Sequence, residues 1–254
     1  MLEIRNLSAG YGAAEILHDI CISVPSGAIT VIAGPNGCGK STLLRTVAGI
    51  IPARGGSVLL DGRDLLGLPP RIQAQQAAYL SQSRQVPEIT AERLVLHGRF
   101  PYLSYPRRYR REDMDIARRA MESMGIGDLA QRYMDTLSGG QRQKVYIAMA
   151  LAQDTPVILM DEPNTFLDIA QQLRMMEEAR ALADAGKTVI LVLHDIALAL
   201  RHADHLVVMK DGRILAQGHP EQVFAGGSLE KAFGIRVERT RTTDGWHYYY
   251  RERK

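Results

Sequence analysis

The segment ITVIAGPNGCGKSTLLRTVAG, residues 29–49, decides the fold. A short apolar run leads into a loop that contains Gly34, Gly37 and Gly39, and a helical pattern begins near Lys40. Glycines let a backbone approach a phosphate closely, and loop amides and a helix N-terminus supply the positive dipole ends that an anion needs. The complete G-x-x-x-x-G-K-S spacing between a strand and a helix therefore predicts a phosphate-binding loop and not a merely structural turn.

Such a loop needs a magnesium site and a carboxylate beside it. We expect Lys40 to reach the β- and γ-phosphates and the Ser41 hydroxyl to bind Mg²⁺. The stretch VILMDEP contains Asp161 and, directly after it, Glu162. In the functional interpretation, Asp161 holds Mg²⁺ and Glu162 acts as general base on the attacking water. In the alternative interpretation, both are solvated turn residues. The phosphate loop favours the functional interpretation of this pair.

Three further residues allow two interpretations each. His194 ends the run TVILVLHD and is either a residue near a γ-phosphate or an ordinary core or surface histidine. Gln82, after AAYL, is either a site residue or a strand cap. Tyr11 is either a platform for adenine or a core aromatic residue.

The rest of the chain alternates short apolar runs with longer helical patterns, which indicates a mainly parallel sheet wrapped by helices. The predicted strands are LEIRNL, ICISV, ITVIAG, SVLL, VILM and TVILVL, starting at residues 2, 20, 29, 57, 157 and 188. The last two are unbroken apolar runs, as in strands buried on both faces. A hairpin with Asp211 and Gly212 at its turn is predicted within residues 205–218. Residues 88–153 look like an inserted helical lobe. The basic, tyrosine-rich tail after about residue 236 is either a strand pair or a contact to a partner.

Composition narrows the class of protein. The 254 residues carry 31 basic and 28 acidic side chains, a net charge of +3, which is too small an excess to indicate nucleic acid binding. Only Cys21 and Cys38 are present, at a spacing that fits no zinc or redox motif, so free thiols in a reducing compartment are expected. No run approaches the ~18 apolar residues of a membrane span. We expect a cytoplasmic protein whose membrane role depends on a partner chain.

These motifs together closely resemble the ATP-binding subunits of ABC transporters over about residues 1–220. The resemblance implies an α/β fold with a RecA-like P-loop NTPase core, an N-terminal antiparallel β subdomain and an inserted helical subdomain. The implied core covers residues 1–85 and 154–220, the lobe about 86–153, and residues 221–254 form a helical patch and the tail. The implied nucleotide-binding residues are Tyr11 (A-loop), Gly34, Asn36, Gly37, Gly39, Lys40, Ser41 and Thr42 (Walker A), Ser138, Gly139, Gly140 and Gln141 (signature LSGGQ), and Asp168 (D-loop).

The resemblance also assigns catalytic and metal roles. Glu162, His194 and Gln82 are the implied catalytic residues, and Ser41, Gln82 and Asp161 the implied ligands of Mg²⁺. In this family the signature of one chain faces the phosphate loop of another, which implies a homodimer that shares two ATP molecules. The implied partners are an integral membrane permease and, indirectly, a periplasmic or surface binding protein, with the ATPase peripheral on the inner face of the membrane. Nucleic acid is not expected.

The substrate depends on weaker signals. LVLHGRFPYLS, which contains Arg99, and DEPNTFLDIAQQ are similar to segments of the importer ATPases for iron–siderophore, haem and cobalamin. Iron–siderophore import is therefore the leading prediction. The alternatives are an importer ATPase for cobalamin, haem or another solute, or a soluble ABC ATPase without a transporter. Asn164 departs from the Ser or Thr that is common after DEP in the family. The basic run RRYRR at 107–111 is either a solvated face or a site of attraction to anionic lipid or the permease, and nucleic acid is a third alternative for this run.

Overall fold

The computed structural model describes residues 1–82, 86–164, 167–243 and 245–252. In it the phosphate loop follows a central strand of a six-stranded sheet and lies at the carboxyl end of that strand. The strand order is β10-β9-β3-β8-β7-β6, and the last five strands are parallel to one another, while β10 is antiparallel to β9. The bounds are β3 (Ile29–Ala33), β6 (Ala77–Leu80), β7 (Val157–Asp161), β8 (Thr188–Val192), β9 (His205–Lys210) and β10 (Arg213–Gly218).

Every residue of β3, β7 and β8 is buried, which confirms the prediction that the unbroken apolar runs are covered on both faces. The hairpin between β9 and β10 is confirmed as well: Asp211 and Gly212 form its turn with φ of 48° and 72°. Because the central strands are parallel, their carboxyl ends all meet at one edge of the sheet. Whatever follows β3, β6, β7 and β8 in the sequence is thereby brought together.

A second, antiparallel sheet contains the N-terminus. Its order is β2-β1-β4-β5, with β1 (Leu2–Tyr11), β2 (Ala14–Val24), β4 (Ala53–Leu60) and β5 (Arg63–Asp64). The predicted strands at residues 2, 20 and 57 are parts of these longer strands. Helix α1 (Lys40–Val47) packs between the two sheets, and its Leu43 and Leu44 are fully buried in a core shared with Leu7 and Leu17. The start of α1 is therefore held by packing on both sides.

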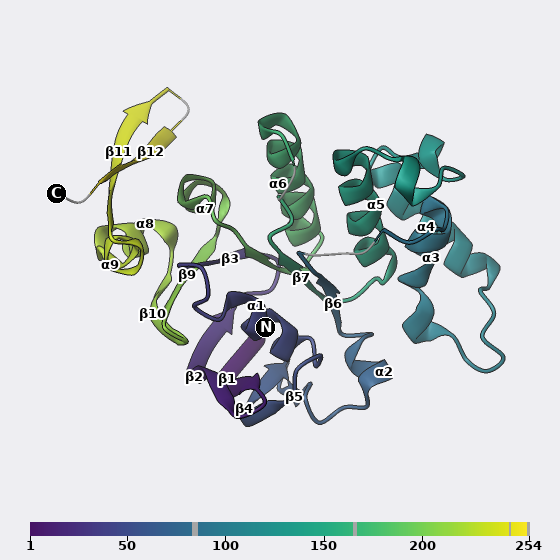
Figure 1. Cartoon of the computed structure of the whole chain (residues 1–254), viewed down its shortest axis with the longest axis horizontal. Coiled ribbons are helices and arrows are strands. Elements are labelled where there is room, and N and C mark those ends of the chain that lie inside the picture. The colour runs from purple at the N-terminus through teal and green to yellow at the C-terminus, as the bar shows by residue number, and fades with distance from the viewer. Residues whose placement is uncertain (83–85, 165–166, 244, 253–254) are drawn as a thin grey trace.

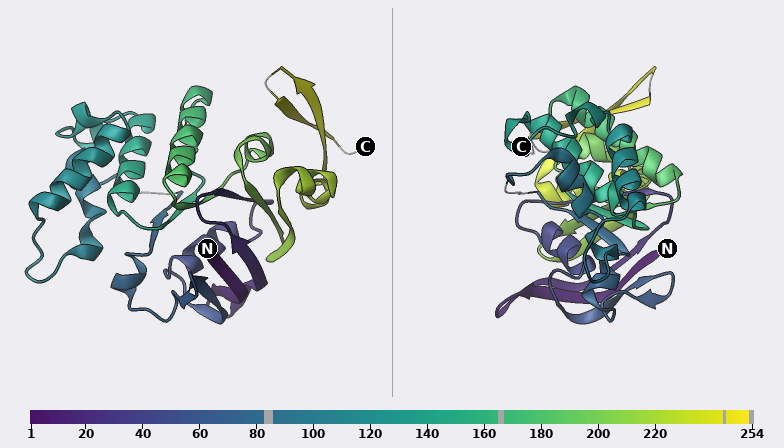
Figure 2. Two further views of the ribbon diagram at one scale, coloured as in Figure 1. Left: turned by 180° about the vertical axis from the view of Figure 1, so that it is seen from behind. Right: turned by 90° about the vertical axis from the view of Figure 1, so that its right-hand side faces the viewer.

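The helical segment lies to one side of the sheets, and Figures 1 and 2 show its helices grouped together. It follows β6 in the chain and contains α3 (Ala91–His97), α4 (Arg111–Ser123) and α5 (Gly139–Ala152), with single turns at Phe100–Tyr102, Gly127–Leu129 and Met134–Thr136. The short α2 (Pro70–Gln73) precedes β6. A continuous core of buried side chains runs from this segment into the parallel sheet. The exact division of residues 1–220 into core and lobe stays a prediction.

The remaining elements are α6 (Ile169–Asp184), which connects β7 to β8, α7 (Ile196–His202), which connects β8 to β9, and, after β10, α8 (Pro220–Ala225), α9 (Ser228–Phe233), β11 (Ile235–Thr242) and β12 (Gly245–Glu252). The last two form a separate antiparallel hairpin from the basic, tyrosine-rich tail, drawn in yellow at the end of the chain in Figure 1.

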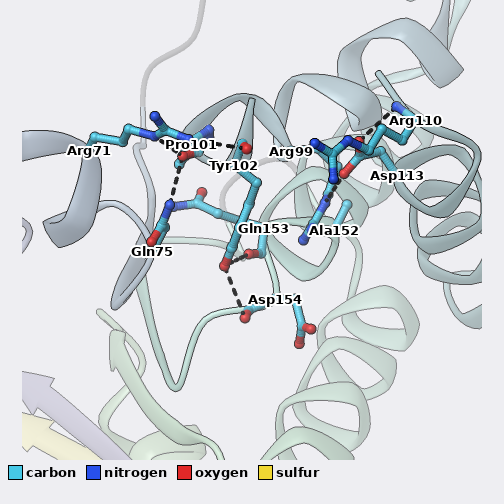
Figure 3. A network of polar contacts seen from close by, with 10 residues as sticks. All are labelled: Arg71, Gln75, Arg99, Pro101, Tyr102, Arg110, Asp113, Ala152, Gln153 and Asp154. Atoms are coloured by element: carbon cyan, nitrogen blue, oxygen red, sulfur yellow. Dashed lines mark hydrogen bonds and ion pairs between the residues drawn. The ribbon is translucent and has the colours of Figure 1, made fainter. Parts of the chain in front are cut away.

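A buried ion pair joins the parts of the helical segment (Figure 3). Arg99 and Asp113 are only 7% and 6% exposed, and the Arg99 Nε lies 3.0 Å from Asp113 Oδ1. The second carboxylate oxygen accepts the Arg110 backbone N–H at 2.9 Å and so caps the start of α4. The guanidinium also donates to the Ala152 carbonyl, 3.0 Å away at the end of α5. One guanidinium thus ties the turn after α3 to both α4 and α5.

Replacing Asp113 with Ala leaves the Arg99 charge buried without its carboxylate. We expect Asp113→Ala to lower the free energy of unfolding by about 3–5 kcal/mol, measured by urea denaturation followed by far-UV circular dichroism. Asp115→Ala is the matched control, because Asp115 forms an exposed pair with Arg118 on the same helix. It should cost less than about 1 kcal/mol. Equal losses in the two variants would contradict the importance of the buried pair.

Candidate functional site

The phosphate loop turns from β3 into α1 in a conformation that requires glycine. Gly37 and Gly39 have φ of 77° and 104°. A Cβ on Gly34 would lie 2.4 Å from the Met209 carbonyl oxygen, so a side chain there would displace the neighbouring strand. Lys40 is buried, and its Nζ donates to the carbonyls of Gly34 and Pro35 at 2.8 and 2.9 Å. The loop therefore surrounds a cationic centre with backbone that an anion can approach closely.

Asp161 lies at the end of β7, fully buried, and faces the start of α1. The Ser41 hydroxyl donates to its Oδ1 at 3.0 Å and the Tyr79 hydroxyl to its Oδ2, also at 3.0 Å. A serine hydroxyl beside a carboxylate is the oxygen donor set that Mg²⁺ prefers. These two residues therefore fit the predicted magnesium site.

Glu162 follows directly and adopts φ of 50°, an uncommon conformation for a residue with a side chain. Its Oε1 lies 2.5 Å from His194 Nε2, and its Oε2 accepts a hydrogen bond from the Gln82 side-chain amide. Gln82 follows β6 and His194 follows β8, so the parallel strands bring both residues to the carboxylate. The alternative interpretations of Gln82 and His194 as a strand cap and an ordinary histidine leave this convergence unexplained.

These residues line one cleft of about 440 Å³, within the usual range for a small-molecule site. Its lining residues are Tyr11, Ile16, Asn36, Gly37, Gly39, Lys40, Ser41, Thr42, Gln82, Glu162 and His194. Ten of them are site residues predicted from the sequence, and Ile16 is the addition. Since Ile16 belongs to an alternating strand, the pattern alone gives no sign of its place in the cleft.

Two residues that the motifs did not identify connect the ends of this cleft. Arg45 Nη1 donates to the Tyr11 hydroxyl at 3.4 Å, and its Nε donates to the Tyr79 hydroxyl at 3.2 Å. Burial raises the pKa of Tyr79 to about 12, so its proton stays available for Asp161. The only local signal for Arg45 is its position one helical turn after Ser41. Tyr11 is 48% exposed at the cleft, so its interpretation as a core residue is wrong.

Comparison with known proteins agrees with this geometry. Residues 17–165 match the protein-family model described as ABC transporter. The chain is 43% identical to the "Probable siderophore transport system ATP-binding protein YusV" of Bacillus subtilis (strain 168), over 94% of this chain and 88% of that protein. It is 40% identical to the ferric enterobactin transport ATP-binding protein FepC of Escherichia coli (strain K12), over 91% and 86%. Among solved structures, the dimeric structure of MJ0796, a bacterial ABC transporter cassette, superimposes with a TM-score of 0.76 and 28% identity over 87% of this chain and 99% of that one.

The chain belongs to the ABC transporter family. It is an ATP-binding subunit of that family, an ATPase that hydrolyses ATP for transport, and the family's α/β P-loop fold is the fold observed. ABC ATPases assemble with permease subunits and form dimers. Among the helices in the described ranges, none combines the length and apolarity that a membrane crossing requires.

The family's signature residues lie apart from the cleft. Ser138 caps α5: its Oγ accepts the Gln141 N–H at 3.3 Å, and the Gln141 side chain accepts the Ser138 N–H at 3.0 Å. Gly139 and Gly140 form the first turn of the helix. Asp168 caps α6 through the Gln171 N–H at 2.8 Å. Among the described residues that line the cleft of the same chain, none is one of these five signature and D-loop residues.

Cys38 lies in the phosphate loop, 5% exposed. Burial raises the pKa of its thiol, and this effect outweighs the nearby Lys40 ammonium, which lowers it. The thiol is therefore less reactive than a free one, so nothing in its surroundings marks Cys38 as a redox-active residue.

The raised pKa of Cys38 predicts slow alkylation at neutral pH. We expect Cys21, the exposed cysteine, to react with iodoacetamide at least about tenfold faster at pH 7.5, as read by mass spectrometry of tryptic peptides. Because the thiolate is the reactive form and burial disfavours it, the Cys38 rate should keep rising with pH above the usual thiol range. The Cys21→Ser variant isolates this slow reaction. Rapid labelling of Cys38 at pH 7.5 would show that the loop activates the thiol.

Proposed function

We propose that this ABC ATPase hydrolyses Mg·ATP to power import of an iron–siderophore chelate through a separate membrane permease. The observation that carries the chelate assignment is the similarity, at 40% identity or more over nine-tenths of the chain, to proteins named for siderophore and ferric enterobactin transport. The hydrolytic half is supported by the convergence of Gln82, Glu162 and His194 beside the phosphate loop.

Different residues of the chain would bind the adenine, the phosphates and the Mg²⁺ of Mg·ATP. Tyr11 offers its exposed ring to adenine, and the loop amides from Asn36 to Thr42 bind the phosphate oxygens. The Lys40 ammonium exchanges its carbonyl partners for the β- and γ-phosphates. Ser41, Asp161 and Gln82 would hold Mg²⁺, which neutralises charge on the β- and γ-phosphates when it is bound.

Glu162 is the proposed general base. In-line attack on the γ-phosphorus needs a water molecule on the side opposite the leaving ADP and a carboxylate that accepts its proton. The contacts of its two oxygens with His194 and Gln82 beside the phosphate loop support this role. His194, at the end of β8, is the group that would contact the γ-phosphate itself.

A second copy would complete the site. Ser138, Gly139, Gly140 and Gln141 form a helix N-terminus that suits the γ-phosphate, yet they lie away from the cleft of their own chain. A head-to-tail homodimer brings each signature to the other chain's phosphate loop, with Asp168 near the contact. The dimeric structure of the MJ0796 cassette supports the formation of a dimer.

The proposed location is peripheral, on the cytoplasmic face of the membrane. ATP is available there, and the permease would reach the subunit from the membrane side. A periplasmic or surface binding protein would deliver the chelate without contacting this chain.

Glu162→Gln removes the base and keeps the side chain's size. We expect turnover to fall by about 10²-fold or more while ATP still binds, because only the proton acceptor is lost. With ATP the variant should accumulate as a dimer in size-exclusion chromatography. Ser138→Arg in the same background is the control: it should bind ATP to one chain and stay monomeric. Native turnover in Glu162→Gln would remove Glu162 as the base, and a dimer in the double variant would argue against the shared site.

Uptake in cells tests the substrate. A strain that lacks this protein should lose uptake of radioactive iron supplied as a siderophore complex, and the native chain but not Glu162→Gln should restore it. The measurement is repeated with labelled cobalamin and with haem. Loss of cobalamin or haem uptake alone would replace the iron–siderophore assignment while leaving the ATPase intact. Unchanged uptake of all three would favour an ABC ATPase with another solute or without a transporter.

A further inference from the structure

The C-terminal hairpin has one face that packs against the body of the protein. Directly opposite residues of β11 and β12 share a face, and the pairs Val237–Tyr250, Arg239–Tyr248 and Arg241–Trp246 therefore lie on the same side. The Tyr248 ring meets Phe224 of α8 edge-on at 5.4 Å between ring centroids. The tail is thus a docked element that follows α8 and α9 (Figure 1).

Arg239 holds the hairpin to α8. Its guanidinium lies 4.0 Å from the centroid of the Trp246 ring and 5.0 Å from that of Phe224, and it pairs with Glu221 at 3.4 Å. The same residue therefore links the turn end of the hairpin to α8 by cation–π contacts and by an ion pair.

At the opposite end, Tyr250 reaches the start of α7. Its hydroxyl donates to Asp195 Oδ1 at 2.9 Å and accepts the Ala197 backbone N–H at 2.6 Å. Asp195 also accepts the Leu198 N–H at 3.1 Å as the cap of α7. Tyr250 is 44% exposed, and partial burial of its hydroxyl raises the pKa of that group, so the proton stays on the oxygen. Two of the amides that a helix start leaves without helical partners are therefore satisfied by Tyr250 and Asp195 together.

The residue before Asp195 is His194, whose Nε2 contacts Glu162. The helix that follows has only seven residues, so its start is poorly fixed by the helix itself. Because Asp195 and His194 are adjacent in the chain, a movement of the Asp195 backbone also displaces His194. The hydrogen bonds of the Tyr250 hydroxyl with Asp195 and Ala197 restrict this movement.

We propose that Tyr250 is a positioning residue: the C-terminal hairpin fixes the Asp195 cap of α7 and thereby holds His194 in its place beside Glu162. This inference rests on the proposed role of His194 at the γ-phosphate. It gives the basic, tyrosine-rich tail a function within its own chain, where the sequence left open a strand pair or a contact to a partner.

Tyr250→Phe and Tyr249→Phe form a matched pair of variants. Each removes one hydroxyl and keeps the ring, but Tyr249 lies opposite Glu238 on the other face of the hairpin. The first measurement needs no ATP hydrolysis: amide hydrogen exchange by NMR in the nucleotide-free protein. Tyr250→Phe should speed exchange at Ala197 at least about tenfold, because that N–H loses its acceptor, while Tyr249→Phe leaves it unchanged. Unchanged exchange at Ala197 in Tyr250→Phe would overturn the proposal. The emission of Trp246, the single tryptophan, verifies in both variants that the hairpin stays docked.

The second measurement asks whether the effect passes through His194. We expect Tyr250→Phe to lower kcat about three- to tenfold with unchanged KM for ATP and unchanged ADP affinity, because only the γ-phosphate contact is disturbed. In a His194→Ala background the same change should have no further effect. A loss of the same size in that background, or a native kcat in Tyr250→Phe, would overturn the positioning role. If His194→Ala alone left kcat unchanged, the proposed role of His194 would fail, and the exchange result would still report on the hairpin contact.

Discussion

The whole site depends on the parallel pairing of β6, β7, β8 and β3. Each strand is short and mostly apolar, and every residue of β3, β7 and β8 is buried, so close packing against both faces fixes the register. Gln82, Glu162 and His194 lie just beyond the carboxyl ends of β6, β7 and β8, and Asp161 is the last residue of β7. Gln82, Asp161 and His194 come from three separate stretches of sequence and meet at one edge for this reason alone. The glycine loop joins them because it begins where β3 ends.

The two buried charged groups at this edge, Lys40 and Asp161, both have hydrogen-bond partners within the chain. Lys40 is buried but surrounded by loop carbonyls, and Asp161 is buried but receives two hydroxyl donors. A buried charge without such partners would cost several kcal/mol, so these contacts make the arrangement compatible with a folded chain. The same contacts are weaker than those a triphosphate and a divalent cation would offer. The site is thus organised in advance and still able to exchange partners.

Sequence reasoning identified the residues that belong to contiguous motifs. The loop, the acid pair at the end of β7 and the turn at Asp211 and Gly212 all follow from local chemistry, and the structure has them where expected. The residues that escaped are joined by long-range contacts: Arg45 reaches Tyr79, and Tyr250 reaches Asp195 across 55 positions of sequence. Arg99 belongs to a segment that is similar to the importer ATPases, but nothing in that segment indicates its buried partner Asp113, which lies in a charged stretch. The hydrophobic periodicity of a sequence does not predict such pairings, because they depend on how distant elements pack against each other.

The geometry of Ser138 bears on how two chains can share one nucleotide. Its hydroxyl oxygen accepts the Gln141 N–H, so capping uses a lone pair and leaves the hydroxyl proton for another acceptor. A phosphate oxygen of a nucleotide bound to a second chain can accept a hydrogen bond from this hydroxyl without breaking the cap. The reciprocal bond from Ser138 N–H to Gln141 meanwhile holds the helix start in shape. The signature can therefore be fully folded in the single chain and still present a donor to its partner. In the proposed dimer, the signature's separation from the cleft of its own chain has a simple meaning: each half-site folds within one chain, and association would bring the two halves together.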